Sequence, residues 1–176
     1  AYWDGDIHWA TLVDLPAENS ITEIQDTIRK ISKVGLKDSS AKLLPVNTVL
    51  ISSRATIGRV GIARVPLATN QGFKNLIIQD SERITPEFLA IMATCLKDKM
   101  ELLASGGTFK EISKSGVATL EIPLPPLQVQ REIVAEIEGY RRVLDGAKQV
   151  VESYKPNVEF FLRKYAQGEP WEMVKL

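Results

Sequence analysis

The residues whose chemistry stands out most are the lysines and arginines between residues 29 and 83. That stretch holds ten basic side chains and three acidic ones, whereas residues 1–28 hold six acids and no Lys or Arg. Basic groups gathered in one stretch of a neutral chain are expected of a surface that contacts phosphates. A solvated face that binds nothing is the alternative. The bases are Arg29, Lys30, Lys33, Lys37, Lys42, Arg54, Arg59, Arg64, Lys74 and Arg83.

Side chains suited to catalysis are sparse. The only histidine, His8, lies near Asp6 in sequence but has no nucleophile close by, so no catalytic triad is predicted. Sequence patterns for nucleoside triphosphates, dinucleotides and the hydrolase nucleophile elbow are not found. A single cysteine, Cys95, forms no internal disulfide or zinc cluster, and we expect it to be buried on a helix. Asp4 and Asp6 are most simply solvated loop acids, so neither a metal nor another cofactor is predicted.

The overall composition is that of a globular protein. The 176 residues are 44% hydrophobic and 25% charged, which is enough for one domain with a core and an appendage. Apolar runs stay well short of the ~18 residues that a membrane span needs. The first residues, AYWDGDIHWA, lack the order of charges and apolar residues of a signal peptide. We therefore expect a cytoplasmic protein without a membrane partner.

Elements that would position the basic side chains begin with short strands. The segments TVLI, TIGRVGIARV and NLIIQ have the β-branched, glycine-interleaved character of strands, and the second is typical of a hairpin or a bulged strand. In residues 21–32 the isoleucines fit a helix while residues 27–31 alternate like a strand, so both readings stay open.

One helix is predicted from Thr85 to the glycines at 106 and 107. Thr85 can cap it, Pro86 suits its first turn, and the two glycines would end it. The segment VATLEIPLPP then predicts a further strand, giving a mixed α/β (α+β) domain that ends near residue 126. The expected buried stripe of the helix is Phe88, Leu89, Met92, Leu96, Met100 and Leu103.

After the prolines of IPLPP the apolar residues follow a heptad pattern. They are spaced alternately by four and three residues over 32 steps, or roughly 48 Å of helix at ~1.5 Å per residue. So long a stripe predicts pairing with another helix, and packing on its own domain is the alternative. Pro156 falls on the outer face of the run. The stripe is Ile133, Ile137, Tyr140, Leu144, Ala147, Val151, Tyr154, Val158, Phe161 and Tyr165.

Five segments together resemble the specificity (S) subunit of type I restriction-modification enzymes. They are AYWDGDIHWATLVDL, LLPVNTVLISSRATIGRVGIA, ATNQGF, SGGTFKEISKSGV and IPLPPLQVQREI, in this order. The resemblance implies a target recognition domain that reads half of a split DNA sequence and a spacer helix that pairs antiparallel with a second copy. It also implies that methylation and cleavage belong to partner M and R subunits, so this chain would be no enzyme.

On this resemblance we expect three parts. Residues 1–126 would be the recognition domain without its first strand, residues 127–168 the spacer helix, and residues 169–176 the start of a following repeat. The second copy of the spacer would come from the same longer chain or from a homodimer. A full S subunit has two recognition domains and two spacers, so reading a bipartite site would require dimerisation or a longer chain.

Candidate DNA-reading residues follow from the chemistry of base edges within the recognition domain. Arg suits guanine, Asn or Gln suits adenine, and Ser or Thr suits either, while Lys and Arg also hold phosphates. Asn70 and Gln71 could instead serve the turn before Phe73. The candidates are Arg54, Thr56, Arg59, Asn70, Gln71, Lys74, Thr108 and Lys110.

Two other functions are compatible with parts of the sequence. One is a helical dimerisation protein with a globular head, which the heptads support equally well. The other is the recognition fragment of a DNA methyltransferase, although the Asn-Pro-Pro-aromatic motif of amino-methylating enzymes is not in the sequence. Salt-dependent binding to duplex DNA separates the first from a DNA reader, and methylation by the protein alone would indicate the second.

Overall fold

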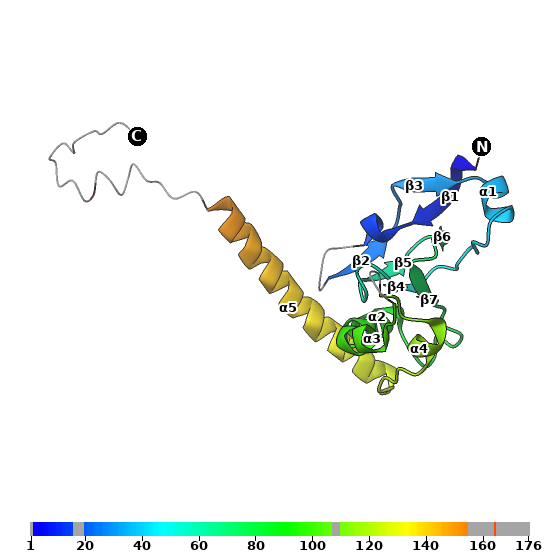
Figure 1. Ribbon diagram of the computed structural model, residues 1–176. Helices are drawn as coiled ribbons and strands as arrows, with labels where there is room; N and C mark the ends of the chain where they lie inside the picture. The colour runs from blue at the N-terminus through cyan, green and yellow to red at the C-terminus, as the bar shows by residue number, and fades with distance from the viewer. Residues whose placement is uncertain (1, 16–19, 107–109, 155–163, 165–176) are drawn as a thin grey trace. The chain divides into compact units, whose positions relative to one another are not determined.

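The computed structural model describes residues 2–15, 20–106, 110–154 and 164. By its internal packing the chain divides into two units, one up to Ala135 and one from Glu136. The first unit, which we call the recognition unit, combines two sheets with short helices (Figure 1). The predicted mixed α/β fold is confirmed.

The larger sheet has four strands in the order β2-β5-β4-β7. The strand pairs differ in direction: β2 runs parallel to β5, whereas β4 is antiparallel to both β5 and β7. The strand predicted at TVLI is confirmed as β4. TIGRVGIARV contains one strand, β5, which pairs with β4, so it is not a hairpin by itself. The predicted strand NLIIQ is placed two residues too late. The strands are β2 (Ile21–Ile24), β4 (Val49–Ser52), β5 (Val60–Ala63) and β7 (Phe73–Leu76).

The smaller sheet has three strands in the order β3-β1-β6. Its central strand β1 is antiparallel to β3 and parallel to β6, and its register slips between Trp3 and Ile7, which both face Ile31. Residues 21–24 and 29–31 are thus strands joined by a short loop, so the helix predicted as one alternative for this segment is wrong. The three strands are β1 (Trp3–Ala10), β3 (Arg29–Ile31) and β6 (Leu67–Thr69).

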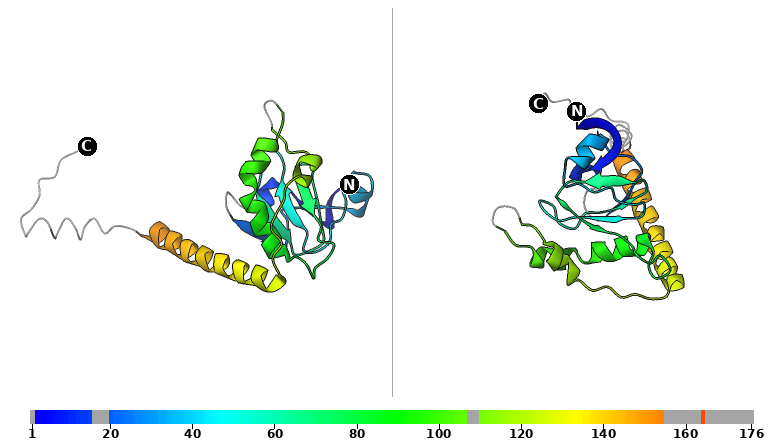
Figure 2. Two further views of the ribbon diagram at one scale, coloured as in Figure 1. Left: turned by 90° about the horizontal axis from the view of Figure 1, so that it is seen from below. Right: turned by 90° about the vertical axis from the view of Figure 1, so that its right-hand side faces the viewer.

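Helices cover the larger sheet on one side and the smaller sheet covers it on the other (Figures 1 and 2). Strand β4 contributes side chains to both layers, because successive side chains of a strand point to opposite faces of the sheet. Val49 and Ile51 pack with Ala93 and Met100 of the helices, whereas Leu50 joins the cluster with Leu67 of β6. A strand buried on both faces has an unbroken apolar run, as TVLI does.

The short helices fall between the strands or after them. Helix α1 follows β3, and α2, α3 and α4 follow β7. The elements are η1 (Leu12–Asp14), α1 (Lys33–Lys37), α2 (Pro86–Cys95), α3 (Lys97–Leu103), α4 (Lys114–Ala118) and α5 (Leu127–Ser153).

The helix predicted from Thr85 to residue 106 is wrong as a single element. Thr85 caps α2 as predicted, with its Oγ1 accepting from the Phe88 N–H, but the chain bends at Leu96 and a second helix follows. The bend brings Ala93 and Met100 into one core cluster. Consequently the buried side chains of α2 and α3 are Phe88, Ala90, Ile91, Ala93 and Met100, while Leu89, Met92 and Leu96 are half-buried and Leu103 is exposed.

Two further predictions in this region are wrong. Cys95 lies on a helix as expected but is exposed, because it is on the side of α2 away from the core cluster. The strand predicted at VATLEIPLPP is not formed. Ser113 starts helix α4 instead, since its Oγ accepts from the Gly116 N–H at 2.9 Å, and prolines offer no N–H to a neighbouring strand.

The start of α5, which belongs to the recognition unit, is held to α2 through the side chain of Gln130. Gln130 is completely buried, and its Oε1 accepts from the N–H of Thr85, the N-cap residue of α2, at 3.0 Å. Its Nε2 donates to the carbonyls of Arg83 and Pro125, both at 2.8 Å. All polar atoms of this amide thus serve the joint between the proline segment and α2.

Helix α5 carries the predicted heptad stripe as far as the structure describes it. Tyr140, Leu144 and Val151 are 62%, 60% and 74% exposed. Tyr154 follows the helix directly and is also exposed. Val158, Phe161 and Tyr165 lie outside the described residues, as does Pro156. The division at residues 126 and 127 stays a prediction: α5 begins at Leu127, yet its first residues belong to the recognition unit.

Candidate nucleic-acid interface

Three segments far apart in sequence meet beyond the end of β4. The Ser53 N–H donates to the Gly72 carbonyl at 2.7 Å, and the Ile112 N–H donates to the Ser53 carbonyl at 3.0 Å. The segment before Ile112 is held in turn by paired backbone bonds between Ser105 and Glu111. We call the outer face of these segments the three-loop surface, formed by residues 53–56, 70–74 and 110–112.

Arg54 lies across the second segment. A Cβ added to Gly72 would come within 3.6 Å of Arg54 Nε and 3.1 Å of Asn70 Oδ1, so the absent side chain of Gly72 leaves the room that both groups use. The backbone beyond Arg54 makes a tight turn, with Ala55 at a φ of 62° and the Thr56 N–H bonded to the Arg54 carbonyl. Arg54 itself is exposed and available to a ligand.

Lys74 and Glu111 form an ion pair on this surface. Lys74 Nζ lies 2.9 Å from Glu111 Oε1 and 3.2 Å from Ser53 Oγ. The hydrogen bond from Lys74 lowers the pKa of Glu111, and the positive charges of Lys74 and Arg54 act in the same direction. Glu111 is therefore an ionised carboxylate at neutral pH, held between two basic residues.

The alternative role of Asn70 in a turn is confirmed. Its Oδ1 accepts from the Gly72 N–H at 2.9 Å, so the Nδ2 amide is the end that can face a base. Gln71, at the tip of the same turn, is exposed. Thr56 is half-buried, and its carbonyl accepts from the Ser52 hydroxyl. The structure thus brings Arg54, Asn70, Gln71 and Lys74 together.

The other predicted residues are placed differently. Arg59 is half-buried beside β5, its N–H bonded to Ser52 Oγ at 2.9 Å, and its Nε is buried without a hydrogen-bond partner among the described residues. Lys110 is exposed next to Glu111, and Thr108 lies outside the described residues. Glu111 and Ser53 were missed, because Glu111 lies outside the basic stretch and a serine within it does not stand out.

Several basic side chains of residues 29–83 form ion pairs within the protein, so fewer of them can bind a ligand than their number implies. Arg64 bonds to Glu23 and Glu87 as well as to Asn47, and so ties β2 to the start of α2. Lys30 pairs with Asp26 at 3.1 Å. The acidic partners of Arg64, Lys30 and Lys74 all lie outside residues 29–83, so counting along the chain overstates the local excess of positive charge.

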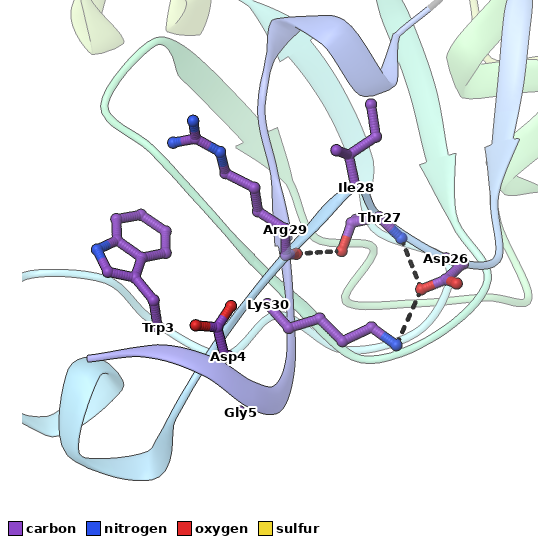
Figure 3. Close-up of a pocket in the computed structure, with 8 residues that line it drawn as sticks. All are labelled: Trp3, Asp4, Gly5, Asp26, Thr27, Ile28, Arg29 and Lys30. Atoms are coloured by element: carbon purple, nitrogen blue, oxygen red, sulfur yellow. Dashed lines mark hydrogen bonds and ion pairs between the residues drawn. The ribbon is translucent and has the colours of Figure 1, made fainter. Parts of the chain in front are cut away.

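A second polar hollow, of about 730 Å³, lies beside β1 and β3 (Figure 3). Arg29 is placed over the Trp3 ring at 5.5 Å from its centroid, and Lys30 reaches Asp26. Asp4 and Asp26 balance the two bases that line this hollow. The three-loop surface instead has three bases, Arg54, Lys74 and Lys110, against one acid, and is the better match for a polyanion.

His8 and the acids near it form a structural contact. His8 Nδ1 lies 3.1 Å from Asp26 Oδ1, which joins β1 to the loop before β3. Within the described ranges, no group of three or more His, Cys, Asp or Glu side chains is placed to hold a metal ion. The part of the chain that the structure describes has no helix both long enough and apolar enough to span a bilayer.

A mixed α/β unit with a basic surface, followed along the chain by a long helix with an apolar stripe, is the arrangement that the sequence led us to expect of a DNA-recognition module. The chain matches the family described as the type I restriction modification DNA specificity domain over residues 2–152. The protein therefore belongs to this family of specificity subunits. Membership confirms the family assignment made from the sequence.

Curated relatives are specificity subunits of type I restriction enzymes. The MjaIX subunit of Methanocaldococcus jannaschii is 32% identical over 174 residues, which are 97% of this chain and 40% of that protein. The EcoprrI subunit of Escherichia coli is 28% identical over 149 residues, 79% of this chain and 36% of the relative. The chain thus spans about two fifths of the length of the curated relatives that it matches.

Solved structures share the fold. The HsdS subunit from Thermoanaerobacter tengcongensis superposes with a TM-score of 0.65 at 20% identity, over 95% of this chain and 37% of that one. A chain from a study of complex assembly and conformational transition of the type I R-M system gives 0.66 at 22% identity, over 95% of this chain and 38% of the other.

Proposed function

We propose that the recognition unit reads one half of a bipartite DNA target through the three-loop surface. The observation that carries this is the convergence of Arg54, Asn70 and Lys74 around Gly72 from two separate segments. Arginine and lysine can hold phosphates or guanine, and an asparagine amide suits a base edge. Arg54 and Asn70 stand on turns fixed by hydrogen bonds, and Lys74 stands on strand β7, which is the preorganisation that sequence reading requires.

The apolar stripe of α5 would pair with a second spacer helix and set the distance between two half-sites. Support comes from the exposure of Tyr140, Leu144 and Val151, because apolar side chains along one side of a helix add stability only when a partner covers them. The second helix would come from the same longer chain or from a homodimer. In such an arrangement half-site spacing follows from helix geometry, as it does in other two-part DNA readers.

The partners of this module would be double-stranded DNA, methyltransferase (M) subunits and restriction (R) subunits, inside the cell. This part of the proposal rests on the family, whose curated members are specificity subunits of restriction enzymes. Catalysis would then belong to the partners, and the chain would need no cofactor of its own.

Salt dependence of DNA binding tests the first proposal. The affinity of the chain for a labelled duplex of random sequence is measured by fluorescence anisotropy at a series of salt concentrations. We expect log K to fall linearly with log salt, by ~0.9 per phosphate contact. Arg54→Ala should reduce that slope by about 1. Lys37→Ala, which removes an exposed base from α1, should leave it unchanged.

Binding without salt dependence, or equal effects of Arg54→Ala and Lys37→Ala, would contradict DNA reading by the three-loop surface. A helical dimerisation protein with a globular head remains the second candidate, favoured by the exposed stripe of α5. It predicts self-association with no measurable affinity for the duplex.

A further inference from the structure

An acid at the centre of a surface proposed to bind DNA calls for a physical reason. Glu111 lies between Lys74 and Arg54, where its charge cancels part of the attraction for phosphate. Its backbone is fixed by two hydrogen bonds with Ser105, at 2.9 and 3.1 Å, so the carboxylate does not stand on a loose loop. A surface that only held phosphates would bind them more tightly without the negative charge of Glu111.

The hydrogen-bonding groups of Lys74 and Glu111 are complementary to those on the major-groove edge of a base pair. An ionised carboxylate only accepts hydrogen bonds, whereas an ammonium group has three N–H donors. Lys74 directs two of them at Glu111 and Ser53, which leaves one for a ligand. In the major groove a G·C pair presents acceptors on guanine, N7 and O6, next to the N4 amino donor of cytosine.

We propose that Lys74 and Glu111 together read one G·C base pair, with Lys74 donating to guanine and Glu111 accepting from the cytosine amino group. The inference rests on the proposed function and adds to it a specificity-determining residue. The donor and the acceptor lie 2.9 Å apart and are held in place before DNA arrives. When the amino group is missing, the carboxylate stays unpaired against the base edge and disfavours the wrong sequence.

The test uses the 176-residue chain and a pool of duplexes with a randomised central segment. Bound duplexes are separated and sequenced, for the wild type and for Glu111→Gln, which keeps the shape of the side chain and removes its charge. We expect the wild type to show one G·C position that the variant no longer prefers, with the discrimination there falling about tenfold or more. Preferences at other positions stay, and affinity for the random pool is unchanged or higher.

Two variants separate specificity from folding and from bulk charge. Lys74→Met should weaken the preference at the same position, because it removes the other half of the pair. Glu101→Gln removes an exposed acid of α3 and should leave the profile as in the wild type. Thermal unfolding shows whether each variant is folded. If Glu111→Gln does not fold, Glu111→Asp, which shortens the reach of the carboxylate, takes its place.

Three outcomes would overturn the inference. The first is an unchanged profile in Glu111→Gln while the wild type binds with sequence preference. The second is a uniform loss at all positions together with weaker binding to the random pool, which indicates a purely structural acid. In both cases the proposed function survives. Absence of salt-dependent binding by the wild type would overturn the inference and the proposed function together.

Discussion

The recognition unit and the later part of α5 use the same kinds of apolar residue in opposite ways. In the recognition unit Val49 and Leu50 are completely buried, whereas on α5 Leu144 and Val151 are 60% and 74% exposed. Burial of a large apolar side chain stabilises a fold by about 1.5–3 kcal/mol, and an exposed one gives nothing until a partner covers it. The recognition unit thus buries these side chains in its own core, whereas those of the α5 stripe would be covered only by the partner helix that we propose.

Polar contacts show the same difference. In the recognition unit Lys74 and Glu111 join positions 37 residues apart, and Gln130 joins positions 45 and 47 residues apart. On α5 the Tyr140 hydroxyl donates to Glu136, only four residues away on the same helix. Long-range bonds fix one tertiary arrangement, whereas contacts within a turn support the helix and leave its partner to be chosen by the apolar stripe.

The largest effect expected from this comparison is on stability. Phe88→Ala should lower the free energy of unfolding of the recognition unit by about 3–5 kcal/mol, because Phe88 is 1% exposed and truncation leaves a cavity. Leu144→Ala is the matched change on α5 and should alter it by less than about 0.5 kcal/mol. Urea denaturation followed by circular dichroism measures both. Similar losses in the two variants would mean that the stripe stabilises the recognition unit directly.

A smaller loss is expected within the recognition unit, where Gln130 holds the start of α5 to α2. Gln130→Leu leaves the N–H of Thr85 and the carbonyls of Arg83 and Pro125 without their partner, at a cost of about 1–3 kcal/mol. Gln128→Leu is the control, since Gln128 is exposed and its Nε2 donates to Glu132 on the same helix. Hydrogen exchange at the Thr85 amide reports the change locally. Unaltered protection of that amide in Gln130→Leu would contradict the anchoring role.

The joint also makes a prediction about spacing. Pro125→Gly together with Pro126→Gly should blur the preference for a fixed half-site distance more than it weakens binding to a single site, because flexible residues would replace the stiff segment before α5. Selection from duplexes with variable spacers measures the first quantity, and anisotropy with one half-site the second. An equal loss of both would show that the prolines matter only for folding.

Pairing of α5 should respond to charge in its stripe. Leu144→Glu should weaken self-association of the chain at least about tenfold, since a carboxylate at the centre of a helix pair is left unpaired. Gln149→Glu adds the same charge on the outer face and should have little effect. Analytical ultracentrifugation gives the dissociation constants. A chain that is monomeric in the wild type would limit pairing to a spacer within a longer protein.

Periodicity carried most of what the sequence revealed. The unbroken apolar run at Val49, Leu50 and Ile51 is a strong strand signal because both faces of β4 are buried, and the heptads of α5 are equally regular. Prediction failed where contacts from far along the chain decide the outcome. The bend at Leu96 and the helix at Lys114–Ala118 depend on packing that a local pattern does not contain.

The candidate interface was predicted in its residue types and not in its geometry. Arg54, Asn70 and Lys74 came from base-edge chemistry, but Glu111 could be found only once its segment was seen beside Ser53. Arg64 shows the opposite error, since acids at positions 23 and 87 engage a base that looked free in the chain.

The smallest effect concerns pH. The hydrogen bond from Lys74 lowers the pKa of Glu111, so the pair stabilises the fold above the unfolded value of ~4.3 and this contribution is lost as pH falls through the lower folded value. Because Glu111 is 42% exposed, solvent screens the pair and the change in stability is slight. Lys74→Met should raise the pKa of Glu111 in an NMR titration of its carboxyl carbon, whereas Lys110→Met should not. Equal shifts in both variants would mean that general charge, and not the specific bond across the three-loop surface, sets this pKa.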